Sequence, residues 1–217
     1  MKIIVYAFKA MRKAVGILLS VVYTPIAKMF FMLNGVEFGE GLRVRGIMKI
    51  LVTRRGKVII GRRLRVNSGD SYNVIGRQQK CILWVEGSLT IMDNVGMSAS
   101  AIICNHQITV GNNVVIGGNT VIYDTDFHSL DAEQRRDPEQ DRINTRWAPV
   151  KIGDNVFIGA HSTILKGVTI GDNSVVGACS VVAKDIPENE IWAGNPAVFI
   201  RKVILRDTAF QSHDGGT

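Results

Sequence analysis

The sequence has 217 residues, of which 46% are apolar and 7% aromatic, and it contains 22 glycines. A chain of this length can bury a core of its own, so we expect one domain with appendages. Scarce aromatics and frequent glycines favour a fold with many turns and a narrow core of Val and Ile. The three cysteines, Cys81, Cys104 and Cys179, are widely spaced and form no CxxC pair. This spacing argues against a disulfide framework or a cysteine zinc site and favours a reducing compartment.

Charge is distributed unevenly along the chain. The formal net charge is +7, but residues 1–80 hold 16 Lys and Arg against 3 acids, whereas residues 81–217 hold 10 against 16. We therefore expect the basic end to meet a negatively charged partner. No nucleic-acid motif accompanies the basic half, so a membrane surface or an anionic glycan is the predicted partner.

Residues 1–35 form an N-terminal segment, apolar and basic over residues 1–33, that we expect to be helical. Ala14–Leu33 has the length of a transmembrane helix but contains Pro25 and Lys28, which disfavours spanning. A cleaved signal peptide would need a small-residue cleavage site, and none is convincing. Two compatible interpretations remain, a cap on the apolar end of the domain and a helix lying on a membrane surface; the second is supported by Lys9, Arg12 and Lys13.

A six-residue repeat follows this segment. From Ile152 to Pro187 a branched apolar residue, usually followed by Gly, recurs every six positions without a slip. An earlier run from Val85 to Ile108 has the same period, and Thr109 then shifts its phase by one residue. Weaker frames at Ile60 and Val66 suggest that the repeat begins before residue 60.

The period predicts a left-handed parallel β-helix, a mainly β solenoid over residues 36–200. Short strands turn every second side chain inward, and a turn must follow within a few residues. Gly and Asn at the ends of the frames suit the positive φ of such corners. An α-helix would need apolar residues at three- and four-residue spacing, and a sandwich would show longer, less regular intervals.

Two other segments lie outside the repeat. Residues 126–149 are charged, and a polar insertion of this length in a solenoid is expected to project from one face and to be functional. We assign its arginines no role, because the neighbouring acids, Asp131, Glu133, Asp137, Glu139 and Asp141, balance them as on a solvated loop. Residues 201–217 form a C-terminal segment whose end, 207–217, is expected to be a frayed polar tail.

The motif YDTDFH at Tyr123–His128, the frames from Ile152, and the closing sequence VAKDIPENEIWAGNPA together resemble the hexapeptide-repeat acyltransferases. The resemblance is greatest to the sugar and polysaccharide O-acetyltransferases related to galactoside and maltose acetyltransferases, and it covers roughly residues 91–201. It implies transfer of an acetyl group from acetyl-CoA to a saccharide hydroxyl in surface polysaccharide or glycan biosynthesis. It also implies a homotrimer with active sites between subunits. Because an exported acyltransferase would lack coenzyme A, we expect a cytoplasmic protein, with peripheral contact at the inner face of the membrane as an open alternative.

His128 is the predicted general base. An alcohol attacks a thioester poorly until it loses its proton, and neutral imidazole is suited to accept that proton near neutral pH. The residue stands where the repeat breaks into the polar loop, and the resemblance puts the family's catalytic histidine here. Asp124 or Asp126 is expected to orient the imidazole, with a slight preference for Asp126 in an orienting or acceptor-side role.

The acceptor and cofactor residues come from the resemblance. Ser98 matches a position at which relatives hold a polar residue against the acceptor, often Asn, and Asn105 is a second acceptor candidate with an equal claim to be a simple corner residue. The matched coenzyme A positions are small residues beside the pantetheine arm and basic residues near the phosphates: Ala160, Ala178, Lys184 and Arg201.

Three alternatives remain open. An N-acetyltransferase acting on an aminosugar or sugar nucleotide would use the same base. A non-catalytic β-helix scaffold would need neither the polar loop nor the closing signature. A zinc enzyme like the γ-class carbonic anhydrases, which share the fold, needs three converging histidines. The candidates are His106, His128 and His161, and their spacing does not resemble that family, so no metal is expected.

Overall fold

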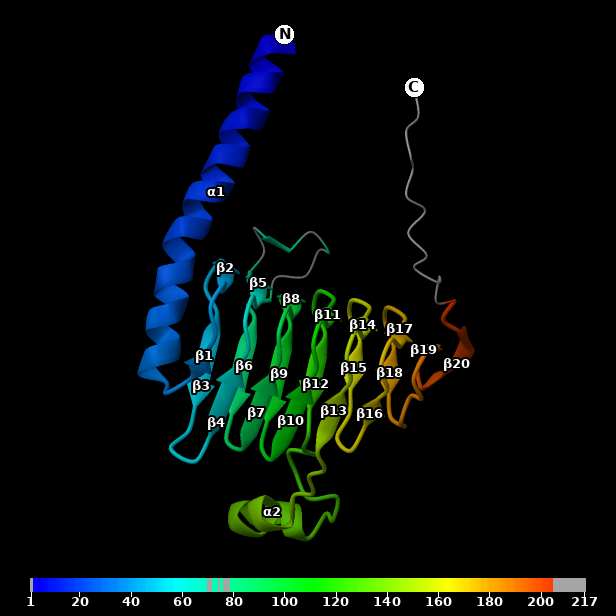
Figure 1. Ribbon diagram of the computed structural model, residues 1–217. Coiled ribbons are helices and arrows are strands. Elements are labelled where there is room, and N and C mark those ends of the chain that lie inside the picture. Colours follow the sequence, from blue (N-terminus) through cyan, green and yellow to red (C-terminus); the bar gives the residue numbers. More distant parts are fainter. Residues whose placement is uncertain (1, 70–71, 74, 76–78, 205–217) are drawn as a thin grey trace.

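The computed structural model describes residues 2–69, 72–73, 75 and 79–204. It consists of one long N-terminal helix, α1 (Lys2–Leu33), and a stack of triangular coils built from three sheets. Figure 1 shows α1 crossing the N-terminal end of the coil stack and projecting beyond it, while a short helix protrudes from the opposite side of the stack. The expected frayed tail, 207–217, lies outside the described residues.

Each sheet takes every third strand of the coil stack, so the chain visits sheets A, B and C in turn. Sheet A contains β1 (Glu37–Phe38), β4 (Lys57–Ile60), β7 (Ser88–Ile91), β10 (Gln107–Val110), β13 (Val150–Ile152) and β16 (Thr169–Ile170). Sheet B contains β2 (Arg43–Arg45), β5 (Arg65–Asn67), β8 (Gly96–Ser98), β11 (Val115–Ile116), β14 (Phe157–Ile158), β17 (Val175–Val176), β19 (Glu190–Gly194) and β20 (Ala197–Lys202). Sheet C contains β3 (Lys49–Val52), β6 (Ile82–Val85), β9 (Ala101–Cys104), β12 (Val121–Tyr123), β15 (Thr163–Ile164) and β18 (Val181–Val182).

All neighbouring strands pair in parallel except β19 and β20, which close the stack as an antiparallel pair. The mainly β, parallel architecture expected from the repeat is therefore confirmed, and the first coil begins at β1, well before residue 60. We call the three corners the AB, BC and CA edges, after the two sheets that meet at each. The frame expected at Val66 is not continued, because among the described residues no strand lies between β5 and β6.

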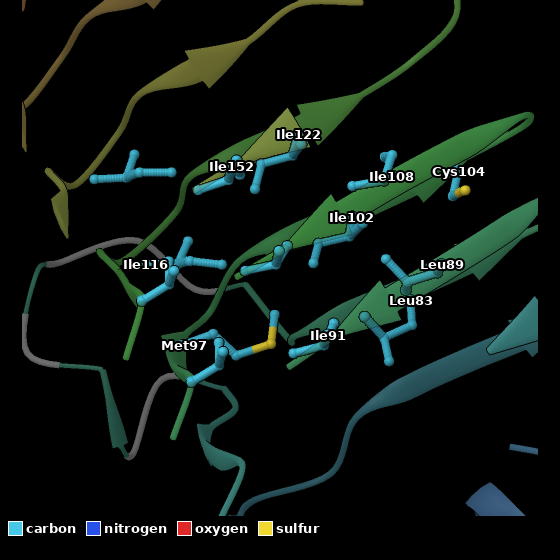
Figure 2. Packing of buried hydrophobic residues seen from close by; sticks show 14 of the residues in the cluster. Leu83, Leu89, Ile91, Met97, Ile102, Cys104, Ile108, Ile116, Ile122 and Ile152 are labelled. Atoms are coloured by element: carbon cyan, nitrogen blue, oxygen red, sulfur yellow. The ribbon is translucent and has the colours of Figure 1, made fainter. Parts of the chain in front are cut away.

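The core is a column of aliphatic side chains along the axis of the coil stack. Alternate residues of each strand point inward, so stacked strands bring like positions into contact. In Figure 2, Leu83, Ile102 and Ile122 from sheet C face Leu89 and Ile108 from sheet A, and all five are fully buried. Their registers are fixed by parallel pairing, as for Ile102 with Ile122 and Leu89 with Ile108.

A row of asparagine side chains ties the coils together along the AB edge. Each adopts a left-handed conformation, with φ between 57° and 63°, which Asn tolerates better than most residues. Each amide Nδ2 donates to the Oδ1 of the next over 2.9–3.0 Å. We call this row the asparagine ladder: Asn94, Asn113, Asn155, Asn173 and Asn189.

The C-terminal half of α1 packs on the first coil. Thr24 Oγ1 accepts the backbone N–H of Val44 at 3.0 Å, which joins the helix to β2. Ala27 and Phe31 are buried, and the Phe31 ring lies 5.5 Å from that of Phe38. This half of the helix therefore covers the open apolar end of the stack.

Candidate functional site

The polar loop leaves the coil stack at the CA edge, between β12 and β13, and its two ends are joined. The backbone N–H of Asp126 donates to the Arg146 carbonyl at 3.0 Å, and that of Ala148 donates to the Asp124 carbonyl at 2.9 Å. A bridge between Thr125 and Trp147 completes a short antiparallel neck. Because of this neck, the residues beyond it are held beside the edge.

His128 is paired with Asp141 within the loop. Its Nδ1 lies 2.7 Å from Asp141 Oδ2, and the backbone N–H of Ser129 donates to Asp141 Oδ1 at 2.6 Å. The His128 side chain is 69% exposed, whereas that of Asp141 is only 15% exposed. The imidazole is thus held from one nitrogen and left open to solvent on the other.

A short helix, α2 (Pro138–Asn144), holds Asp141 in this position. Asp137 caps the helix, its carboxylate accepting the backbone N–H groups of Glu139 and Gln140, each at 2.9 Å, and Pro138 suits its first turn. A single turn of 3-10 helix precedes it at Gln134–Arg136. The loop is therefore folded, and the acids expected only to balance charge include the partner of His128.

The Asp141–His128 contact determines how the imidazole works. The hydrogen bond from His128, followed by that from the Ser129 N–H, lowers the pKa of the Asp141 carboxyl below its ordinary value. An ionised carboxylate beside Nδ1 accepts a hydrogen bond from the Nδ1–H group, so the neutral imidazole keeps its proton on Nδ1 and presents its lone pair at Nε2. The arrangement can remove a proton from a group placed against Nε2.

The structure corrects the expected orienting acids. Asp126 Oδ2 lies 3.5 Å from Lys166 Nζ on the next coil, whereas the His128 partner is Asp141. Asp124 is fully buried and accepts three backbone N–H groups, from Asn105, His106 and Gln107, at 2.7–2.8 Å. Asp124 therefore fixes the turn after β9, and neither acid next to His128 in sequence orients it.

Two adjoining hollows lie beside this edge, with volumes of about 450 and 290 Å³. Asn105, Glu86 and Phe127 line both, so the acceptor candidate Asn105 is close to the loop. Trp147, at the wall of the larger hollow, stacks on His106 with ring centroids 3.6 Å apart. The smaller hollow is walled by Trp84 and Ile103 of the outer face of sheet C.

The remaining acceptor candidate lies elsewhere. Ser98 ends β8 at the BC edge, where its Oγ accepts from Asn67 Nδ2 at 3.3 Å. His128 follows β12 at the CA edge. One chain therefore does not bring Ser98 and His128 to the same edge.

The predicted cofactor residues are divided in the same way. Ala160 and Ala178 occupy successive coils at the BC edge, where the Cys179 N–H donates to the Ala160 carbonyl at 2.8 Å. Lys184 follows β18 at the CA edge, on the side of the loop, and Arg201 lies in the terminal strand β20; both are exposed. His161 lies at the BC edge, whereas His106 and His128 lie at the CA edge. Among the described residues, no group of three or more His, Cys, Asp or Glu is arranged to hold a metal ion.

Sequence reasoning missed Asp141 and the aromatic walls of the two hollows. Asp141 lies 13 residues from its partner, within a run of acids that sequence alone does not rank. Its position three residues after a proline that starts a helix was the available signal, since it puts the carboxylate on a fixed element. Trp84, Phe127 and Trp147 are half exposed and gather at the two hollows, and a cluster of exposed aromatic side chains marks a surface in use.

Comparison with known proteins agrees with this geometry. Residues 149–184 match the model of the bacterial transferase hexapeptide family, described as six repeats. Galactoside O-acetyltransferase of Escherichia coli is 42% identical over 113 residues, 52% of this chain and 53% of that protein. The galactoside O-acetyltransferase of Lactococcus lactis is 39% identical over 110 residues, 51% of this chain and 49% of the relative.

A solved structure of a variant of AntD, an N-acyltransferase from Bacillus cereus, in complex with dTDP-4-amino-4,6-dideoxyglucose and coenzyme A, is 20% identical with a TM-score of 0.62. It covers 81% of this chain and 89% of that one, and it supports the fold alone. The chain spans about half the length of the curated relatives it matches. The resemblance to the hexapeptide-repeat acyltransferases, with relatives named galactoside O-acetyltransferase, is confirmed, and the chain carries this family's repeat.

Proposed function

We propose that the protein transfers an acetyl group from acetyl-CoA to a hydroxyl of a saccharide acceptor, with His128 as the general base. The observation that carries the proposal is the 2.7 Å contact of His128 Nδ1 with Asp141, beside two hollows at the CA edge. The relatives named galactoside O-acetyltransferase favour a sugar hydroxyl. We further propose surface polysaccharide or glycan assembly in the cytoplasm, where the donor is available.

In the proposed reaction the acceptor hydroxyl gives its proton to His128 Nε2 as its oxygen attacks the thioester carbonyl carbon. A C–O bond forms, and the carbonyl electrons move to oxygen. When the tetrahedral intermediate collapses, the C–S bond breaks and the imidazolium returns the proton to the leaving thiolate. Asp141 stabilises that imidazolium and holds the tautomer that can accept a proton at Nε2.

The hollows suit a sugar acceptor. Trp84, Phe127 and Trp147 offer exposed ring faces, which pack against the apolar faces of pyranose rings, and the Asn105 amide has hydrogen-bonding groups for hydroxyls. The competing proposal is N-acylation of an aminosugar nucleotide. The same base could serve that reaction, since an amine also loses a proton as it attacks the thioester.

Coenzyme A binding is proposed at a composite site. Ala160 and Ala178 leave room for a narrow arm along the BC edge, and Lys184 and Arg201 supply positive charge for the phosphates. His128 is on the CA edge, so a neighbouring copy must bring its BC edge to it. We therefore propose that residues 36–200 form a left-handed β-helix that assembles as a homotrimer, a closed ring of head-to-tail contacts.

The test is product analysis with acetyl-CoA and a panel of sugars. Mass spectrometry is expected to show one added acetyl group, released by mild alkali as an ester is, and the His128→Ala variant is expected to lose at least about a hundredfold in rate. An alkali-stable product on amino sugars would favour the N-acyl alternative. Full activity of the folded His128→Ala variant would refute the mechanism, and a protein inactive towards every sugar would favour a non-catalytic scaffold.

A further inference from the structure

The N-terminal half of α1 projects from the coil stack without covering any of it. Every described side chain from Lys2 to Val15 is exposed, although most are apolar. Figure 1 shows this half of the helix extending beyond the coils of sheet B. Large exposed apolar side chains on a projecting helix indicate a surface that another phase or molecule covers.

The exposed residues are ordered around the helix. Lys2, Lys9 and Lys13 fall on the same side as Thr24, which binds β2. The opposite side carries large apolar residues at intervals of three and four, each between 46% and 74% exposed. We call these residues the apolar stripe: Ile4, Phe8, Met11, Val15, Leu18 and Val22.

An arginine face adjoins the helix on sheet B. We define it as Arg43, Arg45 and Arg65, all exposed, and among the described residues none of them forms an ion pair with a carboxylate. By contrast, Arg62 close by is neutralised by Asp93 at 2.7 Å. The arginine face therefore presents uncompensated positive charge.

Apolar and cationic groups meet in the same hollow. A space of about 520 Å³ between α1 and β2 is lined by Val21 and Pro25 of the helix and by Arg43 and Arg45 of the sheet. A second space, of about 500 Å³, lies beside it and is lined by Arg43, Arg63 and Arg65. Apolar chains next to guanidinium groups match a molecule that is hydrocarbon at one end and anionic at the other.

The length and composition of α1 are also sufficient for a membrane span. The window of it with the fewest charges, residues 14–33, includes the buried Ala27 and Phe31 and the bonded Thr24. A span through that window would detach the helix from the coil stack. A span through the free half would bury Lys9 and Lys13 in hydrocarbon, so the geometry favours a helix at the interface.

We propose that α1 and the arginine face dock the protein on an anionic phospholipid bilayer. The apolar stripe enters the outer part of the acyl layer, while the lysines of α1 and the arginine face lie at the headgroup phosphates. Helices of this kind bind by combining buried apolar area with attraction to anionic lipid. This proposal is independent of the proposed acetyl transfer, because it uses no residue at the CA edge.

The first test is flotation of the full-length protein with vesicles of phosphatidylcholine alone or mixed with phosphatidylglycerol. Binding is expected only to the mixed vesicles and is expected to weaken as salt rises. Replacing the arginine face by glutamine is expected to lower the vesicle partition coefficient at least about tenfold, since each basic residue near the surface contributes roughly a fivefold change. A matched control removes three exposed cations elsewhere and should bind as the parent does: Arg136→Gln, Lys151→Gln and Lys202→Gln.

The second test addresses the apolar stripe. Phe8→Ser with Met11→Ser and Val15→Ser is expected to abolish flotation while leaving the melting temperature of the coil stack unchanged, because these side chains are exposed. Leu130→Ser with Ile143→Ser, at exposed positions of the loop, controls for surface apolarity. Absence of binding to the anionic vesicles would overturn the proposal. So would an apolar-stripe variant that still binds vesicles but changes oligomeric state, because the stripe would then cover another copy of the chain.

Discussion

Replacing Asp141 by Asn tests the proposed mechanism most directly, because the carboxylate serves two donors. Oδ2 lies 2.7 Å from His128 Nδ1, and Oδ1 accepts the Ser129 N–H at 2.6 Å. Asn has one acceptor oxygen. In a first orientation, the Asn oxygen accepts from His128 Nδ1–H, and the Asn NH₂ group then faces the Ser129 N–H. In a second orientation, the oxygen accepts from the Ser129 N–H, and the Asn NH₂ group donates to an unprotonated Nδ1, so that the imidazole proton is on Nε2.

The second orientation removes the base, because Nε2 then carries the proton it should accept. The first orientation keeps the base, but it loses the negative charge that stabilises the imidazolium, and it sets two N–H donors, those of the introduced Asn and of Ser129, against each other. We therefore expect kcat to fall by about 10²- to 10⁴-fold, the range that a positioned base contributes. The KM for acetyl-CoA should stay within about twofold, since the change leaves ground-state binding of the donor untouched.

The assay is steady-state release of coenzyme A thiol, with circular dichroism and melting temperature to show that each variant is folded. Glu139→Gln, on the same helix and exposed, is the matched control and should keep full activity. A folded Asp141→Asn protein that retained more than a tenth of kcat would refute the role given to this carboxylate.

Three further predictions follow from other contacts. In His128→Ala, the pKa of the Asp141 carboxyl should rise toward its ordinary value, as measured by carbon NMR. In the parent protein this pKa is lowered by folding, so the ionised carboxylate contributes stability above the ordinary carboxyl pKa. That stability is lost as pH falls through the lowered pKa. An unchanged pKa would mean that the contact is not made in solution. Gly87→Ala should lower the free energy of unfolding by about 1–3 kcal/mol, since its Cβ would lie 2.1 Å from the His106 carbonyl oxygen, whereas Gly16→Ala, with open space around it, should not lower it. If the site is shared between copies, mixing and exchanging subunits of His128→Ala and Ala178→Trp should restore about a quarter of parental activity, and no recovery would place both residues in one site of one chain.

Most of the scaffold could be predicted from the sequence because it is repetitive. An inward-pointing residue such as Ile152 predicts that residues six and eighteen positions away also point inward, so the apolar positions of many repeats support the same prediction. The corner asparagines add an independent signal, since few other residues tolerate their backbone conformation.

The site is less repetitive, and the prediction was correspondingly less complete. His128 could be selected because a motif surrounds it, but its partner is set by the fold of a unique loop. The prediction therefore chose between the two nearby acids, Asp124 and Asp126, and gave Asp141 no role. The resemblance likewise selected Ser98 by its place in a motif, although Ser98 ends β8 at the BC edge and His128 follows β12 at the CA edge. Contacts made across a loop or between edges depend on three-dimensional position, which the period does not encode.

The asparagine ladder continues without interruption past the point at which the polar loop is inserted. Asn113 Nδ2 donates to Asn155 Oδ1 across 42 residues of sequence at the same distance as between Asn155 and Asn173, which are 18 apart. The coils on either side of the insertion are therefore in register through the opposite corner. The rest of the loop can therefore vary in length and sequence around His128 and Asp141 without disturbing the scaffold, so acceptor preference can change within one surface insertion.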